Sequence, residues 1–197
     1  MEPVPYEEFV DAHRDLSEAE FLARVRWPVL LVPPFALAHD NPADTPFLTN
    51  AFSPEALSGK LAGGRVVIAP VRKREGANAF TGMVTLGRAA NNDVVLHNSN
   101  VSKFHAYIRK IGESWTVSDA NSLNGTELDG KVLPSEHPFP VRSGSRLRLS
   151  SVVCLQFLLP EELYRRVQDG SLPPWQHYLP DAADPDLETE VVAFGRR

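Results

Sequence analysis

Residues 102–126 read SKFHAYIRKIGESWTVSDANSLNGT, a stretch from which the fold class can be inferred. Two runs in it, His105–Lys110 and Trp115–Ser118, alternate apolar and polar side chains with the period of two that indicates a half-buried β-strand. The stretch closes near Asn124-Gly125, a hairpin-turn signal, because both central positions of such turns need positive φ. It therefore predicts two short strands followed by a tight turn.

The same period extends to both sides of this stretch. Further short strands are predicted at Arg65–Val71, Thr81–Gly87, Asp93–Leu96, Lys131–Leu133, Arg146–Leu149 and Val152–Leu158. Asp129-Gly130 is a second hairpin signal. No helical segment between these strands is long enough for a βαβ crossover. Many short strands at regular spacing predict an all-β sandwich or barrel over residues 61–160.

The first 60 residues predict a short helical arm and a Pro-rich connector. Ser17, with Glu20 three residues later, forms a capping box that starts a helix, and Pro28 ends it. A further helical turn or two can lie within residues 5–14. Because proline is confined to sheet edges and six prolines occur between residues 28 and 54, Val29–Val32 is predicted as an edge strand.

Residues 161–197 predict a short helix and an acidic tail. Pro160 stands at a first helical position and Gly170 at the point where a helix ends. The prolines and acidic residues that follow predict a loosely docked or disordered tail.

Composition excludes several classes of protein. The chain has 197 residues, of which 43% are hydrophobic and 23% charged, as in soluble globular proteins. Cys154 is its only cysteine, which excludes an internal disulfide and a Cys-rich zinc site, and its apolar neighbours predict a buried position. The apolar stretch over residues 27–38 is broken by prolines and too short to span a bilayer, and the acidic N-terminus does not resemble a secretory signal. We expect a cytoplasmic protein that binds no membrane.

Charge is distributed unevenly along the chain. Residues 61–150 carry 12 basic and 7 acidic side chains, whereas residues 1–60 carry 4 and 10, and residues 151–197 carry 4 and 8. A basic middle between acidic flanks suggests an anionic ligand for the middle. The alternative is a solvated surface with uneven charge.

Three polar clusters occur at predicted strand ends of the basic region. They are Gly87-Arg88, Ser102-Lys103-Phe104-His105 and the turn-rich segment Asp119–Thr126. Arginine, lysine, hydroxyl and amide groups in loops are the donors that would hold a phosphate, and a planar guanidinium can donate two charge-assisted hydrogen bonds at once. Mobile polar loops on a rigid sheet are a frequent arrangement for recognition.

Together these clusters resemble the forkhead-associated (FHA) domain. The resemblance rests on Gly87-Arg88, Asn92–Leu96, Val101–Ala106, Asp119–Thr126 and Asp129-Gly130, and the strand pattern extends it to about residues 62–160. It implies a two-sheet β-sandwich whose loops bind phosphothreonine peptides, with no catalytic activity, no cofactor and no metal. The partner it implies is a phosphothreonine-containing protein, such as a Ser/Thr kinase or its substrate.

The resemblance also implies roles for single residues. Arg88 and Ser102 match the positions that contact the phosphate, Lys103 a position that contacts phosphate or peptide, and Asn124 the one that holds the ligand backbone. A supporting group, which shapes the binding loops, comprises Gly87, His105, Asp119, Gly125 and Thr126. Leu123 departs from the pattern, because many members carry there a polar side chain that donates to the phosphate. This departure favours an alternative, a structural interaction scaffold of the same fold with weak or lost phosphate binding.

Two other interpretations of the polar residues are weaker. Ser102, His105 and Asp119 could form a nucleophilic triad, but no strained nucleophile turn is present and the Ser-x-x-His spacing does not place the histidine as a base. The basic run Arg72-Lys73-Arg74 could contact nucleic acid, but no aromatic residues interleave it, so a solvated loop is favoured. We therefore expect neither catalysis nor nucleic-acid binding.

Thr189 is a candidate regulatory phosphosite. It is flanked by Glu188 and Glu190 in the acidic tail. Once phosphorylated, it could occupy the chain's own phosphate site. The alternative is a solvated acidic tail.

Overall fold

The computed structural model describes residues 3–33, 36, 66–150 and 153–170. Most of the predicted Pro-rich connector, the predicted acidic tail and Thr189 lie outside these residues. Among the described residues, no helix is long and apolar enough to cross a membrane.

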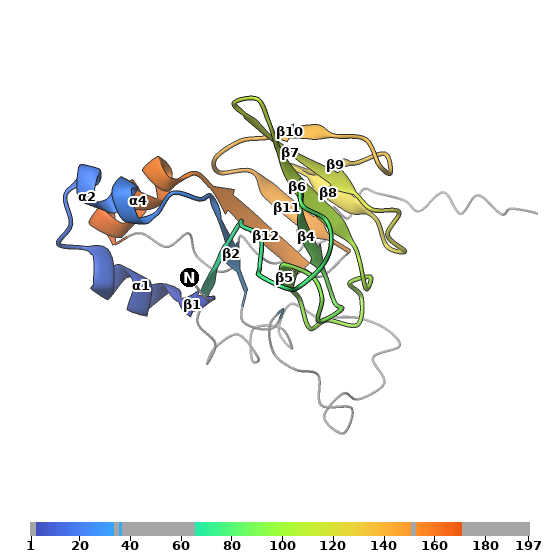
Figure 1. Ribbon diagram of the computed structural model, residues 1–197, viewed down its shortest axis with the longest axis horizontal. Helices are drawn as coiled ribbons and strands as arrows, with labels where there is room; N and C mark the ends of the chain where they lie inside the picture. Colours follow the sequence, from blue (N-terminus) through green and yellow to red (C-terminus); the bar gives the residue numbers. More distant parts are fainter. Residues whose placement is uncertain (1–2, 34–35, 37–65, 151–152, 171–197) are drawn as a thin grey trace, which may run out of the picture.

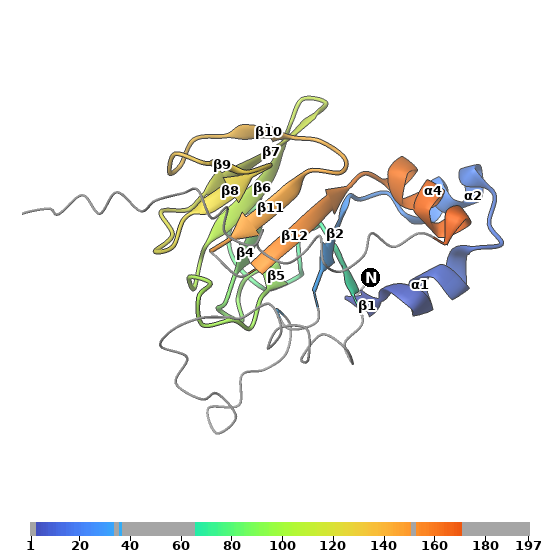
Figure 2. The ribbon, with the colours of Figure 1, turned by 180° about the vertical axis from the view of Figure 1, so that it is seen from behind.

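Two β-sheets pack face to face (Figures 1 and 2). The seven-stranded sheet has the order β1 (Val4–Pro5), β3 (Val67–Pro70), β2 (Val29–Val32), β12 (Val153–Leu158), β11 (Arg146–Leu149), β8 (Thr126–Leu128) and β9 (Lys131–Val132). The five-stranded sheet has the order β10 (Phe139–Val141), β7 (Ser114–Asp119), β6 (Ala106–Ile111), β4 (Val84–Gly87) and β5 (Val94–Val95). All neighbours are antiparallel except β4 and β5, which are parallel. The predicted two-sheet sandwich is thus confirmed.

The main core fills the space between the sheets. It includes Leu86, Ile108 and Val117 from the five-stranded sheet and Leu147 and Phe157 from the seven-stranded one. These side chains alternate along each strand with outward-facing ones, as the period of two predicts. The core therefore holds the two sheets face to face.

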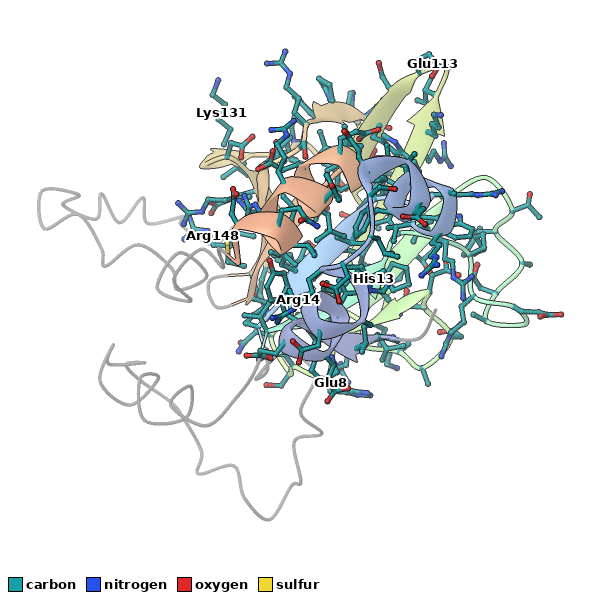
Figure 3. The ribbon with its side chains drawn as sticks, turned by 90° about the vertical axis from the view of Figure 1, so that its left-hand side faces the viewer. Glu8, His13, Arg14, Glu113, Lys131 and Arg148 are labelled. Atoms are coloured by element: carbon teal, nitrogen blue, oxygen red, sulfur yellow. The ribbon has the colours of Figure 1, made fainter. Side chains whose placement is uncertain are left out.

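A second core lies on the outer face of the seven-stranded sheet, under three helices. These are α1 (Tyr6–His13), α2 (Glu18–Arg24) and α4 (Pro160–Asp169), which gather on the side nearest the viewer in Figure 3. Phe21 of α2 is fully buried there, and α2 begins with the capping box of Ser17 and Glu20. Cys154 of β12 is buried in this second core, as predicted.

The prediction of an edge strand at Val29–Val32 is wrong. This strand, β2, lies between β3 and β12, and each of its four residues is at most 1% exposed. Alternate side chains face the main core and the core under the helices, so both faces of the strand are apolar. The neighbouring prolines lie beyond the ends of the strand and leave its hydrogen bonds intact.

The two turn signals have different outcomes. Asp129 and Gly130 have φ of 51° and 80° and join β8 to β9 as a tight hairpin, as predicted. At Asn124-Gly125 only Gly125 has positive φ, 75°, and the chain crosses there from β7 in one sheet to β8 in the other. The hairpin prediction at this pair is therefore wrong, and the short strand β8 that follows it was not predicted.

Candidate functional site

An open groove lies at the end of the five-stranded sheet where β4 and β7 finish and β6 begins, opposite the β6–β7 hairpin tip, whose Glu113 is labelled in Figure 3. Its volume is about 420 Å³. The residues that line it are Arg88, Ser99, Asn100, Val101, Ser102, Lys103, Phe104, Leu123 and Asn124. The four residues predicted to contact ligand, Arg88, Ser102, Lys103 and Asn124, are thus all in its wall.

Arg88 follows β4 directly and is held from its backbone. Its N–H donates to the Ser102 carbonyl over 2.9 Å, and its side-chain Nε donates to the Val101 carbonyl over 3.2 Å. Within the described part of the chain, the two terminal guanidinium nitrogens have no acceptor. The Nε contact fixes the direction of the side chain and leaves its planar fork available to an anion.

Gly87 is required by close packing. A Cβ built on Gly87 would lie 2.5 Å from the carbonyl oxygen of Lys103 and 2.9 Å from Nδ2 of Asn92. These atoms belong to a tight cluster, since Asn92 Nδ2 donates to the Lys103 carbonyl over 2.6 Å and Ala89 N–H donates to the same oxygen over 3.1 Å. The missing side chain therefore lets the Arg88 turn lie directly against the Ser102-Lys103 backbone.

Ser102 and Leu123 join two of the groove's loops. The Leu123 N–H donates to Ser102 Oγ over 3.0 Å. Because the hydroxyl accepts in this bond, its own proton is free to be donated into the groove. The Leu123 side chain is 89% exposed, so it adds an apolar edge to the groove and no donor.

Lys103 and Asn124 complete the polar lining. Lys103 is exposed, and Nζ has no acidic partner in the described ranges. Asn124 Nδ2 donates to the Asn100 carbonyl over 2.8 Å, which orients the amide and leaves its Oδ1 and second N–H free. Lys103 therefore offers charge, and Asn124 offers the paired donor and acceptor that a peptide backbone requires.

His105 is a buried tie between the loops. Its Nδ1 accepts from Ser102 N–H over 3.0 Å, so Nε2 carries the proton and donates to the Gly125 carbonyl over 3.0 Å. Desolvation lowers the pKa of His105, and the hydrogen bond to Gly125 and the charge of Asp119 offset this only in part. The lowered pKa favours the neutral form of the ring. Both ring nitrogens are bound to backbone groups, so His105 cannot act as a base toward the Ser102 hydroxyl.

Asp119 organises the loop between β7 and β8. Its carboxylate accepts from Ser122 N–H over 3.0 Å, from Ser122 Oγ over 2.5 Å and from Thr126 Oγ1 over 2.6 Å. Desolvation by itself raises the pKa of Asp119, but these hydrogen bonds together lower the pKa by more. The net shift of the pKa is downward, so the carboxylate stays ionised. The carboxylate is thus satisfied by hydrogen bonds within the loop, and Asp119 does not line the groove.

A further set of contacts supports the Arg88 turn from behind and was not predicted from the sequence. Lys73 Nζ donates over 2.7 Å to Oδ2 of Asp93, whose side chain is fully buried, and Arg74 N–H donates to Oδ1 over 2.9 Å. The Arg74 guanidinium then donates to the carbonyls of Ala90 and Asn92, in the turn after Arg88. Lys73 and Arg74, interpreted above as part of a solvated loop, therefore brace the Arg88 turn.

The chemistry of the groove is that of an anion site. One arginine fork, one lysine and one free hydroxyl proton lie in its wall, while the Asp119 carboxylate, at the start of the loop that carries Leu123 and Asn124, is occupied by internal hydrogen bonds. The described residues contain no group of three or more His, Cys, Asp or Glu side chains that could hold a metal ion.

The family model of the FHA domain matches residues 84–150, about a third of the chain. No curated protein matches the sequence.

Several solved structures are similar to this chain. EmbR of Mycobacterium tuberculosis, in complex with a low-affinity phosphopeptide, is 26% identical, with 50% of this chain and 22% of that chain covered and a TM-score of 0.40. The MEK1 FHA domain in complex with a HOP1 phosphothreonine peptide is 24% identical, with coverage of 47% and 87% and a TM-score of 0.39. The FHA domain of the CT664 protein from Chlamydia trachomatis is 16% identical, with coverage of 68% and 97% and a TM-score of 0.42.

Proposed function

We propose that this chain, which contains an FHA domain at residues 84–150, binds phosphothreonine-containing proteins through the groove between Arg88 and Asn124. In this proposal it is a non-catalytic adaptor of cytoplasmic Ser/Thr kinase signalling. The observation that carries the proposal is the convergence of uncompensated cationic and hydroxyl donors on one open groove.

A phosphate group suits these donors in charge and in geometry. A phosphothreonine carries a charge of about −1.5 to −2 at neutral pH and three strong acceptor oxygens. The free fork of Arg88 can bind two of the oxygens, and the Ser102 proton can be donated to the third. The exposed Lys103 ammonium adds a further positively charged contact at the rim of the groove. Each charge-assisted hydrogen bond contributes roughly 1.5–3 kcal/mol.

A peptide suits the groove better than a free phosphate ion does. Asn124 is oriented by the Asn100 carbonyl with one donor and one acceptor left free, which matches the N–H and C=O groups of an extended chain. The groove is open to solvent, so an extended polypeptide can lie across it. The loops that carry these groups are fixed by His105 and Asp119, so little ordering entropy is lost on binding.

A binding assay with phosphopeptides tests the proposal. The full chain and Arg88→Ala are titrated with a library of phosphothreonine peptides, alongside matched phosphoserine and unphosphorylated peptides. We expect micromolar binding that requires phosphothreonine and falls at least tenfold in Arg88→Ala. Arg142→Ala is the matched control, because Arg142 is exposed beside Val141, which pairs with Trp115 at the far end of β7. Its affinity should equal that of the wild type.

The alternative is a scaffold of the same fold that does not depend on phosphate. The exposed apolar Leu123 favours it, since that position adds no side-chain donor to the phosphate. Folded wild-type protein that binds phosphorylated and unphosphorylated peptides equally would establish this alternative and refute the phosphothreonine reader.

We further propose that phosphorylated Thr189 competes for the groove. Thr189 belongs to the same chain, and a tethered segment can reach an effective concentration in the millimolar range, which exceeds what a micromolar ligand requires. Phosphorylation would then reduce binding of partners.

A further inference from the structure

A row of aromatic rings begins at the groove and continues along the outer face of the five-stranded sheet. The ring centroids of Phe80 and Phe104 are 5.8 Å apart, and those of Phe104 and Tyr107 are 6.1 Å apart. The guanidinium of Arg109 follows, 4.8 Å from the centroid of Tyr107. Phe104 belongs both to this row and to the lining of the groove, so the two surfaces are continuous.

The row faces away from the main core. Tyr107 and Arg109 flank Ile108 on β6, and Ile108 is buried between the sheets, so its neighbours point outward. None of the four members is fully buried, and Phe80 is 48% exposed. A cluster of partly exposed aromatic side chains on one face is typical of an interaction site.

The row is also fixed in place. Asn78 Oδ1 accepts from the Phe80 N–H over 3.1 Å and from Lys73 Nζ over 2.7 Å, and Lys73 is itself bound to buried Asp93. The loop that presents Phe80 is therefore anchored to the interior of the domain. A held aromatic side chain loses little conformational entropy when a partner covers it.

Arg109 gives the row an uncompensated positive charge. In the described portion of the chain its side chain has no carboxylate partner, and its buried Nε has no acceptor. Its neighbour Lys110, by contrast, is paired with Glu113. A carboxylate beside an apolar side chain is the chemistry that complements Arg109 and the rings together.

We propose that a second segment of the phosphorylated partner, carrying an aromatic and an acidic residue, docks along Phe80, Phe104, Tyr107 and Arg109. This inference rests on the proposed function, because the phosphothreonine is what places the segment beside Phe104. An extended chain advances about 3.3 Å per residue, so a segment of a few residues is long enough to follow the row from Phe104, in the groove wall, to Arg109. The aromatic side chain stacks on Phe80 and Phe104, and the carboxylate pairs with Arg109.

Short and extended phosphopeptides distinguish binding along the row from binding in the groove. The short probe is a phosphothreonine peptide of about seven residues selected with the wild-type chain, which is long enough for the groove alone. The extended probes add about six residues on each side of the short probe, which is long enough to reach Arg109. In one extended probe the added residues are all Gly and Ser, and in the others they have degenerate sequence. Each is titrated into the full chain as wild type, Phe80→Ser and Arg109→Gln.

Val132→Ser and Arg142→Gln are the matched controls. Val132 is 71% exposed on β9 of the other sheet, and Arg142 is exposed at the far end of the sandwich, so neither belongs to the row. Circular dichroism verifies that every variant is folded.

The expected result is a selective loss of the benefit of extension. The degenerate probes that bind the wild type best should be enriched in aromatic and acidic residues and should bind about fivefold more tightly than the Gly/Ser-extended probe. Phe80→Ser and Arg109→Gln should abolish this gain and leave affinity for the short probe unchanged, while both controls keep the gain.

Three results would overturn the inference. The first is a wild type that prefers no residues in the extension, and the second is a preference that survives in both row variants. The third is a self-associated wild type that Phe80→Ser converts to monomer in sedimentation analysis, which would assign the row to a second copy of the chain. If the short probe shows no phosphate-dependent binding, the proposed function itself fails and the docking inference fails with it.

Discussion

Gly87→Ala would place a methyl group where the structure has no room for one. Gly87 lacks a positive φ, so alanine is compatible with its backbone, and the whole effect comes from contact. The new Cβ would lie 2.5 Å from the Lys103 carbonyl oxygen and 2.9 Å from the Lys103 carbonyl carbon. Both are backbone atoms and cannot rotate away, so the Arg88 turn and the Ser102-Lys103 segment must separate.

The size of the effect follows from what the separation disrupts. Overpacking of this kind costs about 1–3 kcal/mol. The separation also strains the hydrogen bonds from Arg88 N–H to the Ser102 carbonyl and from Ala89 N–H to the Lys103 carbonyl, each contributing about 1 kcal/mol. We therefore expect Gly87→Ala to lower the free energy of unfolding by about 2–4 kcal/mol, or Tm by roughly 5–15 °C.

Binding should weaken with stability, because the same separation moves Arg88 away from Ser102. Urea unfolding gives the change in free energy, and titration with a phosphothreonine peptide gives the change in Kd, expected to be at least tenfold. Gly82→Ala is the control, since a Cβ at Gly82 meets nothing within 4 Å, and it should change stability by no more than about 1 kcal/mol. If Gly87→Ala behaved like Gly82→Ala in both assays, the close contact would have no role in forming the site.

Three further predictions concern the hydroxyl, the buried histidine and the tail. Ser102→Ala removes the proton donated to the phosphate, so peptide affinity should fall roughly 10- to 100-fold in a competition assay while the fold is kept, and unchanged affinity would exclude a role for the hydroxyl. Desolvation lowers the pKa of His105 in the folded state, so the unfolded state binds the proton more readily. Urea unfolding should therefore show a free energy of unfolding that falls as pH drops from about 7.5 to 5.5, and a flat profile contradicts a neutral buried His105. Stoichiometric phosphorylation of Thr189 should raise the Kd for an added phosphothreonine peptide, and an unchanged Kd removes the proposed competition.

The proposed ligand-contacting residues were predictable from the resemblance to the FHA domain together with local pattern. The period of two places Arg88 and Ser102 next to predicted strand ends, whereas Asn124 was assigned by the resemblance alone. The structure brings these three residues and Lys103 into one wall. The sandwich and the Asp129-Gly130 hairpin were predictable from local pattern, since each depends on neighbours in the sequence.

Contacts between distant segments were not predictable. The central position of β2 depends on pairing with β3 and β12, which lie far along the chain, and its second apolar face depends on the helices that cover it. A run of four apolar residues between prolines reveals neither. Lys73 and Asp93 are 20 positions apart, so nothing in the basic run itself indicates that it is pinned to a buried carboxylate. The need for glycine at position 87 likewise comes from the carbonyl of Lys103 across a loop.

Binding of phosphothreonine in the groove can be observed residue by residue in a two-dimensional NMR titration of the 15N-labelled chain. A phosphothreonine peptide is added stepwise, and then its unphosphorylated twin. We expect the phosphorylated peptide, and not the unphosphorylated one, to shift the amide signals of the groove residues Arg88, Ser102, Lys103, Leu123 and Asn124. Shifts of equal size with both peptides, or shifts confined to the far end of the sandwich, would contradict binding of phosphothreonine in the groove.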